Sequence, residues 1–235
     1  MLEPLPDSFV AARDALHALA EHVLAPARYR AETHIGLVPA SGGFGTPMFG
    51  DGERVRVDGV ELVHERPGTS TRVRITTLGA AAQFVGIPLG APAEVYKPAT
   101  PCDPDRALAV DPDAAQALAA WIALGDSLLS ALCETYTMHS PTAATIWPEH
   151  FDLACEIGDA EAGTRANYGA SPGDGAIPQP YLYVGPWDGS RRSGKLATYP
   201  WGAAITYEEL CATGDAKGAG TDFFLEGAAL LLGQP

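Results

Sequence analysis

Apolar residues recur at every third or fourth position in several segments, which is the spacing of helices that bury one face. The first helix is predicted over 8–25, and Pro26 is expected to end it. A second is predicted over 111–136, because Asp111-Pro112-Asp113 is a typical helix start. Gly125 lies on its apolar stripe, which predicts a close neighbour on that face. Two further helices are expected, a short one over 77–87 and an apolar one over 222–232.

Alternating polar and apolar residues predict strands in the first half of the chain. Residues 33–40 are expected to form a strand, and the glycine-rich segment 41–52 a loop. The segments on either side of Asp58-Gly59 predict a β-hairpin over 54–64, because this dipeptide suits a tight turn. Residues 69–75 alternate again, as in an antiparallel strand with one face in solvent.

The second half of the chain contains four more candidate strands and a proline-rich crossing segment before them. The crossing segment is 91–112, and the strands are expected over 142–147, 151–157, 181–185 and 203–210. No regular β-α alternation occurs, so a parallel sheet is not expected. The prediction is an α+β protein in which a mostly antiparallel sheet is covered by about three main helices, and residues 1–235 form a single domain.

The composition indicates a chain that folds unaided, and its charge argues against some classes of partner. Of the residues, 46% are hydrophobic and 19% charged, which is typical of a folded chain. The net charge is -14 and the basic residues are scattered, so nucleic acid is not an expected partner. The first residues lack the pattern of a secretory signal, and no uninterrupted apolar stretch approaches the ~18 residues of a membrane span. We therefore predict a cytoplasmic protein that is not in a membrane.

The four cysteines do not form a recognisable pattern. Cys102, Cys133, Cys155 and Cys211 lie far apart and include no CxxC pair. Cys133 and Cys155 fall on apolar positions of a predicted helix and a predicted strand. We interpret all four as reduced thiols in the core, in preference to a disulfide or metal framework.

The strand predicted over 151–157 offers the best candidate for acid-base chemistry. Period-two geometry places His150, Asp152 and Glu156 on one side of it. His150 with Glu149 or Asp152 could then serve as an acid-base pair, and these three are the candidate catalytic residues. An ordinary solvent-facing strand explains the same pattern. No metal-ligand spacing such as HExxH occurs, so no metal ligands are assigned and no cofactor is named.

The segment from 163 to 187 is rich in turn-forming residues and yet carries aromatic and polar side chains. Long loops in compact domains are often functional, and Tyr, Trp, Arg and Asn suit a ligand site. The alternative is a strand face with a core tryptophan. The candidate ligand-binding residues are Trp147, Arg165, Asn167, Tyr168, Asp174, Tyr181, Tyr183 and Trp187.

Three strings in this half, WPEHFDLA, RANYGASPGD and PYLYVGPW, resemble a family of uncharacterised actinobacterial proteins in which they recur in the same order. THIGLVPASGGFGTPMFGDG and TLGAAAQFVG resemble its N-terminal half, so the resemblance covers most of the chain. A looser similarity links the chain to a wider domain of unknown function. The resemblance implies no activity, substrate or cofactor.

The expected function is that of a cytoplasmic pocket protein for a small-molecule ligand, and an enzyme if the His150 pair acts in proton transfer. One alternative is a non-catalytic protein-interaction or homo-oligomeric module. Another is a metal-dependent hydrolase. The sequence does not indicate the ligand, the reaction or the oligomeric state.

Overall fold

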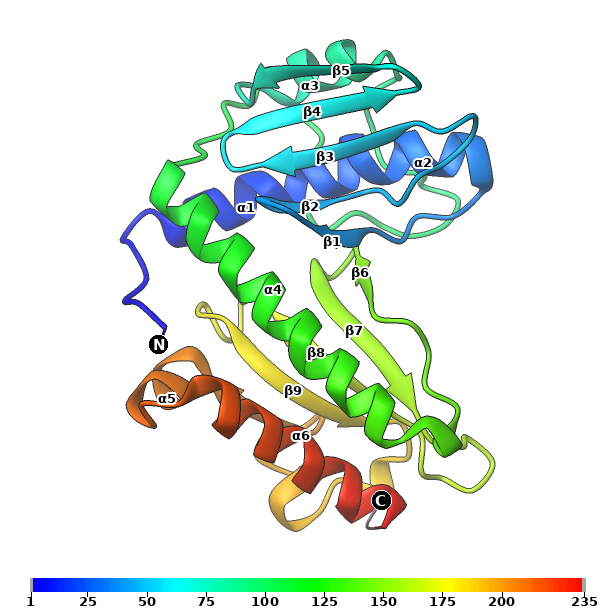
Figure 1. Cartoon of the computed structure of the whole chain (residues 1–235), viewed down its shortest axis with the longest axis vertical. Coiled ribbons are helices and arrows are strands. Elements are labelled where there is room, and N and C mark those ends of the chain that lie inside the picture. Colours follow the sequence, from blue (N-terminus) through cyan, green and yellow to red (C-terminus); the bar gives the residue numbers. More distant parts are fainter. Residues whose placement is uncertain (1, 234–235) are drawn as a thin grey trace. The chain divides into compact units, whose positions relative to one another are not determined.

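The computed structural model describes residues 2–233 and has an α+β fold with two antiparallel sheets (Figure 1). Contacts divide the chain into two compact units. The N-terminal unit comprises Leu5–Ile122 and Ile146–Phe151, and the C-terminal unit contains most of the remainder. The α+β class and the antiparallel pairing are confirmed. Two sheets are present where the sequence predicted one, and the helices exceed the expected three. The single domain stays a prediction.

The sheet of the N-terminal unit is an antiparallel meander in the order β1-β2-β3-β4-β5. The predicted hairpin is confirmed, since Asp58 pairs with Glu61 across a two-residue turn in which Gly59 has a φ of 60°. The glycine-rich segment predicted as a loop contains β2, where Gly45 approaches Arg56 too closely for a side chain. The strands are β1 (Val38–Ala40), β2 (Gly43–Gly45), β3 (Arg54–Asp58), β4 (Glu61–Arg66) and β5 (Thr69–Arg74).

The outermost strand of this sheet, β5, differs from its prediction. The alternation predicted one buried face, but every residue of β5 is exposed, including Val73 at 38%. As the edge strand, β5 pairs only with β4, so little of the unit covers it. The arginines on it face solvent, which suits an edge that must not pair with another chain.

The first helix does not end at the proline as predicted. α1 (Phe9–Leu19) passes into a π-helical turn (Ala20–Leu24), and α2 (Ala25–Glu32) continues behind the sheet in Figure 1. Pro26 lies at the first turn of α2, where its missing N–H and fixed φ are tolerated. The predicted short helix is confirmed as α3 (Leu78–Val85), and the side chain of Thr77 caps it.

The second sheet is also an antiparallel meander, in the order β10-β9-β8-β7-β6, and its strands β7 to β10 belong to the C-terminal unit. β8 was not predicted, because the sequence pattern there indicated a loop. Arg165 precedes this strand, and Asn167 and Tyr168 lie on it. The strands are β6 (Thr145–Trp147), β7 (Asp152–Ile157), β8 (Ala166–Ser171), β9 (Tyr181–Pro186) and β10 (Ala203–Thr206).

Two helical segments pack on one face of strands β7 to β9, residues 123–135 of α4 (Pro112–Thr135) and α6 (Ala216–Leu232), as Figure 1 shows. A Cβ atom at Gly125 of α4 would lie 2.6 Å from the Cβ of Ala170, so the predicted close neighbour is confirmed. On α6, a Cβ atom at Gly227 would lie 2.8 Å from a methyl group of Val184. Small residues therefore bring both helices close to the strands.

The last predicted strand is shorter than expected. β10 ends at Thr206, and α5 (Tyr207–Ala212) begins there because Thr206 and Glu209 form a reciprocal capping box. α6 also begins earlier than predicted, since Asp215 accepts a hydrogen bond from the N–H of Gly218 and caps it.

Within residues 2–233, α4 alone is long and apolar enough to cross a membrane by length and composition, with a mean hydropathy of 1.4. The core helix of a soluble protein passes the same test, so this evidence is weak. The predicted absence from a membrane and the cytoplasmic location stay predictions.

Candidate functional site

The residues predicted to form the acid-base pair do not share one strand. Phe151 has a left-handed backbone conformation, with a φ of 54°, so the extended geometry of β7 begins only at Asp152. His150 lies in the preceding turn and is exposed. The prediction that His150 shares a strand face with Asp152 and Glu156 is therefore wrong, because the period-two argument holds only along continuous extended backbone.

Glu149 and Trp147 lie near the same turn, in the N-terminal unit. The ring of Trp147 is half-buried and its centre is 6.3 Å from that of His34. Oε2 of Glu149 is buried and has no hydrogen-bond partner among residues 2–233. Burial, followed by the charges of Glu21 and Glu149, raises the pKa of Tyr96 above its usual value. Glu149 therefore lies near the phenol of Tyr96.

In the C-terminal unit, Asp152 and Tyr183 meet on the face of the sheet opposite α4 and α6. Asp152 lies on β7 and Tyr183 on β9, with Gly169 of β8 between them. A Cβ atom at Gly169 would lie 2.7 Å from the hydroxyl oxygen of Tyr183, so the ring passes over this glycine. The hydroxyl donates a hydrogen bond to Asp152. Burial first, and the Asp152 charge next, raise the pKa of Tyr183 well above its usual value.

Tyr181 and Asp174 form a second pair on this face. The hydroxyl of Tyr181 donates to one carboxylate oxygen of Asp174 at 2.7 Å. The other oxygen accepts from the backbone N–H groups of Ala176 and Ile177, at 2.7 and 2.8 Å. The ring of Trp201 lies 6.0 Å from that of Tyr181. These contacts fix the loop between β8 and β9.

Arg165, Asn167 and Trp187 are also brought together, as the sequence suggested. Arg165 forms an ion pair with Glu156, and its guanidinium lies 5.2 Å from the centre of the Trp187 ring. Nε1 of Trp187 donates to Oδ1 of Asn167 at 2.7 Å. Two open hollows of about 230 and 500 Å³ lie beside Arg165. The polar atoms bind one another, so this group ties together the ends of three strands.

Tyr168 lies on the opposite face of the sheet, where it is fully buried. Its ring meets that of Phe224 on α6 edge to face, with centres 6.2 Å apart. The prediction that Tyr168 lines the same site as Asn167 is therefore wrong, because neighbouring residues of a strand point to opposite faces.

The π-helical turn buries two ionisable residues to which the sequence pattern gave no role. Glu21 and His22 are both inaccessible to solvent. Glu21 accepts hydrogen bonds at 2.8 Å from the N–H groups of Ala99 and Thr100, one at each carboxylate oxygen. A ring nitrogen of His22 lies 2.9 Å from the carbonyl oxygen of Thr100. π-Turns often occur at functional sites, but here both carboxylate oxygens hold the segment before Pro101 against the helix.

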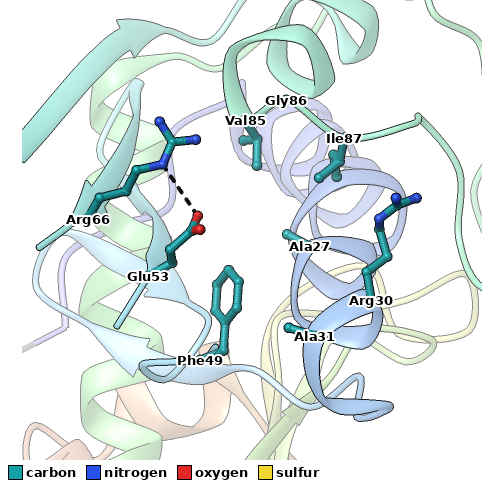
Figure 2. Close-up of a pocket in the computed structure, with 9 residues that line it drawn as sticks. All are labelled: Ala27, Arg30, Ala31, Phe49, Glu53, Arg66, Val85, Gly86 and Ile87. Atoms are coloured by element: carbon teal, nitrogen blue, oxygen red, sulfur yellow. Dashed lines mark hydrogen bonds and ion pairs between the residues drawn. The ribbon is translucent and has the colours of Figure 1, made fainter. Parts of the chain in front are cut away.

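An open pocket of about 260 Å³ lies between the sheet and α2 in the N-terminal unit (Figure 2). Glu53 and Arg66 stand on one side, and Ala27 and Ala31 of α2 face them from the other. The ring of Phe49 lies at one end. The other lining residues are Val85, Gly86 and Ile87 at the end of α3, and Arg30 at the rim. One wall therefore carries the Glu53–Arg66 pair, and the other is formed by small apolar side chains with Arg30 at its rim.

The carboxylate of Glu53 is held by two groups through a single oxygen. Nε2 of His64, a buried side chain, lies 2.9 Å from Oε2 of Glu53, and Nε of Arg66 lies 3.5 Å from the same atom. Oε1 accepts no hydrogen bond from the part of the chain that the structure describes. The hydrogen bond with His64 and the charge of Arg66 lower the pKa of Glu53, although burial opposes them. Glu53 is therefore ionised at neutral pH with one oxygen unused by the protein.

No family model, curated protein or solved structure matches the chain. The resemblance to an uncharacterised family stays an expectation. Function is therefore inferred from the chemistry of the pocket.

A signal for this pocket is present in the sequence. The paired residues of the β3–β4 hairpin include Arg54 with Glu65, so Glu53 and Arg66 are the next pair outward. Sequence reasoning predicted the hairpin but did not extend its register to these charges. Phe49 is joined to the start of the hairpin by an isolated antiparallel bridge to Glu53. The helices α2 and α3 could not be added in this way, because only tertiary packing brings them to the hairpin.

The described residues, 2–233, contain no group of three or more His, Cys, Asp or Glu side chains placed to hold a metal ion.

Proposed function

We propose that the N-terminal unit binds a small molecule that carries an ammonium group and a carboxylate beside an apolar body, as an apolar α-amino acid does. Oε1 of Glu53 accepts a hydrogen bond from the ammonium group, and Arg66 binds the carboxylate. The apolar body lies between Phe49, Ala27 and Val85. The observation that carries the proposal is an ionised carboxylate and a guanidinium side by side on one wall of a pocket whose other wall presents Ala27, Ala31 and Val85, with Arg30 at the rim.

The geometry of Arg66 supports the second contact. Its contact with Glu53 uses Nε, and no contact of its two terminal nitrogens occurs within residues 2–233. A guanidinium binds a carboxylate best through two parallel N–H groups. His64, which is 2% exposed, stays behind Glu53 and fixes the position of its carboxylate.

The size of the pocket supports a small ligand. Its 260 Å³ is below the roughly 300–1,000 Å³ of pockets that hold drug-sized molecules. The pocket is also open to solvent, since 53% of the Arg66 side chain and 38% of the Glu53 side chain are exposed. We therefore expect weak, rapidly exchanging binding, with a Kd on the order of 1 mM, or about -4 kcal/mol.

Binding fits the pocket better than proton transfer does. A general base works best when its pKa is near the working pH, and the pKa of Glu53 is lowered from that of an ordinary glutamate. Catalysis by His150 with Glu149 or Asp152 stays a prediction. The interaction module and the metal-dependent hydrolase also stay predictions.

The proposal is tested by titrating ¹⁵N-labelled protein with three related compounds and following the amide signals by NMR. L-Phenylalanine carries both charges, 3-phenylpropionate lacks the ammonium group, and 2-phenylethylamine lacks the carboxylate. We expect phenylalanine to shift the signals of Phe49, Glu53, Arg66 and Val85. Each truncated compound should bind roughly tenfold more weakly, because it lacks one charge-assisted hydrogen bond.

Two variants assign the contacts. Glu53→Gln keeps the size of the side chain and removes its charge, so it should abolish the advantage of phenylalanine over 3-phenylpropionate. Arg66→Gln should abolish the advantage over 2-phenylethylamine. Arg74→Gln is the matched control, because Arg74 is an exposed arginine of β5 outside the pocket. Equal binding of all three compounds, or signal shifts confined to other residues, would overturn the proposal.

A further inference from the structure

Two of the four cysteines lie together in the C-terminal unit. Cys133 is in the last turn of α4 and Cys155 is on β7, and their sulfur atoms are 3.6 Å apart. Cys133 is partly accessible to solvent, whereas Cys155 is 2% exposed. All four cysteines are free thiols. The prediction that all four lie in the core is wrong, because Cys102 is exposed on the crossing segment and Cys211 is half-buried.

We propose that Cys133 and Cys155 form a thiol–disulfide exchange site that takes a low-molecular-weight disulfide. In the first step the thiolate of Cys133 attacks one sulfur of that disulfide, forms a mixed disulfide and releases one small thiolate. In the second step Cys155 loses its proton to solvent and attacks the sulfur of Cys133, and the second small thiolate leaves. Two protein thiols are oxidised to one disulfide, and the small disulfide is reduced to two thiols.

The surroundings of the two sulfur atoms assign the order of attack. When Cys133 is ionised, the thiol of Cys155 can donate a hydrogen bond to it, and this contact lowers the pKa of Cys133, against its partial burial. The same contact, and then burial, raise the pKa of Cys155. Cys133 is also the thiol that a dissolved molecule can reach. Cys133 is therefore the attacking residue and Cys155 the resolving residue.

Closing the bond requires a small movement. The sulfur atoms must approach from 3.6 Å to about 2.05 Å. Cys133 is placed two residues before the end of α4 at Thr135, where few helical hydrogen bonds follow it. The proposal requires that rotation of its side chain, with a slight adjustment of the last turn, brings the atoms together.

A buried hydroxyl supports a reactive role for this pair. Tyr168 is the register partner of Cys155 on β8, and both side chains face the helices. The hydroxyl of Tyr168 is buried and has no hydrogen-bond partner among residues 2–233. Burial, and then the Cys155 thiol, raise the pKa of Tyr168, so the group stays a donor. Tyr168 is a positioning residue that can stabilise the thiolate of Cys155 in the second step.

The experiment uses the full chain with Cys102→Ser and Cys211→Ser, which leaves only the proposed pair. Neither replaced residue is buried, so the variant should fold, which circular dichroism checks. The reduced protein is incubated with oxidised glutathione, quenched with N-ethylmaleimide under denaturing conditions and weighed by mass spectrometry. We expect a product that has lost two hydrogens and takes up no maleimide, and a cross-linked peptide that joins Cys133 to Cys155. Dithiothreitol should restore both thiols.

Two further variants in this background test the assigned roles. Cys155→Ala should stop at the mixed disulfide on Cys133, and Cys133→Ala should leave Cys155 unmodified while the protein is folded. Tyr168→Phe should slow closure more than formation of the mixed disulfide. If the parent variant keeps both thiols, or if glutathione accumulates on Cys133 without closure, the proposal is overturned.

Discussion

Replacing Gly169 by alanine tests how the Tyr183–Asp152 hydrogen bond is built into the second sheet. The ring of Tyr183 crosses β8 directly above Gly169, and the added methyl group would lie 2.7 Å from the tyrosine hydroxyl oxygen. Asp152 is 7% exposed, so its carboxylate depends on donors from the protein. The substitution should lift the ring and separate the hydroxyl from the carboxylate.

The expected cost follows from three contributions. Forcing a methyl group into this packed contact costs about 1–3 kcal/mol. Losing a hydrogen bond to a buried charge costs about 1.5–3 kcal/mol. Replacing glycine by alanine in a strand returns about 0.5–1 kcal/mol. We therefore expect Gly169→Ala to lower the free energy of unfolding by about 3 kcal/mol, a large part of the roughly 5–15 kcal/mol of a typical domain.

Urea unfolding followed by circular dichroism and tryptophan fluorescence measures this change. Gly185→Ala is the matched control, because Gly185 lies on the same sheet face and a Cβ atom there would meet only the carbonyl oxygen of Trp201, at 3.7 Å. It should raise the free energy of unfolding by about 0.5–1 kcal/mol, which is the gain expected from alanine in a strand without a clash. In a Tyr183→Ala background Gly169→Ala should cost almost nothing. An equal cost with and without the tyrosine ring would refute the reasoning.

Three further predictions concern other parts of the chain. Glu21→Ala should lower the free energy of unfolding by about 3 kcal/mol and expose the amides of Ala99 and Thr100 to hydrogen exchange, because both amides lose their acceptor. Unchanged protection of both amides would contradict the role of Glu21 in holding this segment against the helix. Burial raises the pKa of Tyr207 to about 12, so its contribution to stability is complete below pH ~10 and is lost as the pH rises toward 12. The free energy of unfolding, measured from pH 8 to 11, should therefore fall less steeply with pH in Tyr207→Phe than in the parent protein. Cys133 and Cys155 are 22 residues apart, so a disulfide between them should raise the free energy of unfolding by about 3 kcal/mol in the chain-entropy model. Calorimetry with and without reductant would detect this increase. A lower Tm after oxidation would contradict it and would indicate that the disulfide strains the native structure.

The fold class could be predicted because apolar residues recur at helical spacing in each long helix and alternate with polar residues in most strands. The strand β8 could not, because its sequence, ANYGAS, consists mainly of small and turn-forming residues. Those small residues are required by tertiary contacts, since Ala170 lies under Gly125 of α4 and Gly169 lies under Tyr183. A local pattern of small residues indicates a loop, whereas here the same residues let a helix and an aromatic ring approach a central strand.

The first helix illustrates a second limit. Pro26 was expected to stop it, because proline lacks an N–H and clashes with the preceding turn. The chain instead widens into a π-helical turn at Ala20–Leu24, and Pro26 then occupies the first turn of α2. The contacts of Glu21 with Ala99 and Thr100, 78 and 79 residues away, accompany this turn. The helix thus continues where long-range hydrogen bonds are available, and such bonds have no local signature in the sequence.

Long-range packing also explains why His150 does not share the strand face of Asp152 and Glu156. Phe151 stacks on His17, with ring centres 5.1 Å apart, and its edge-to-face contact with Phe44 is at 5.0 Å. A left-handed conformation costs a non-glycine residue about 1–2 kcal/mol, and burying an aromatic ring between two others can offset that cost. The backbone therefore turns at Phe151 to place its ring, and His150 is left in solvent. The alternation of FDLACEI correctly predicts β7, but it carries no information about a residue that lies before this turn.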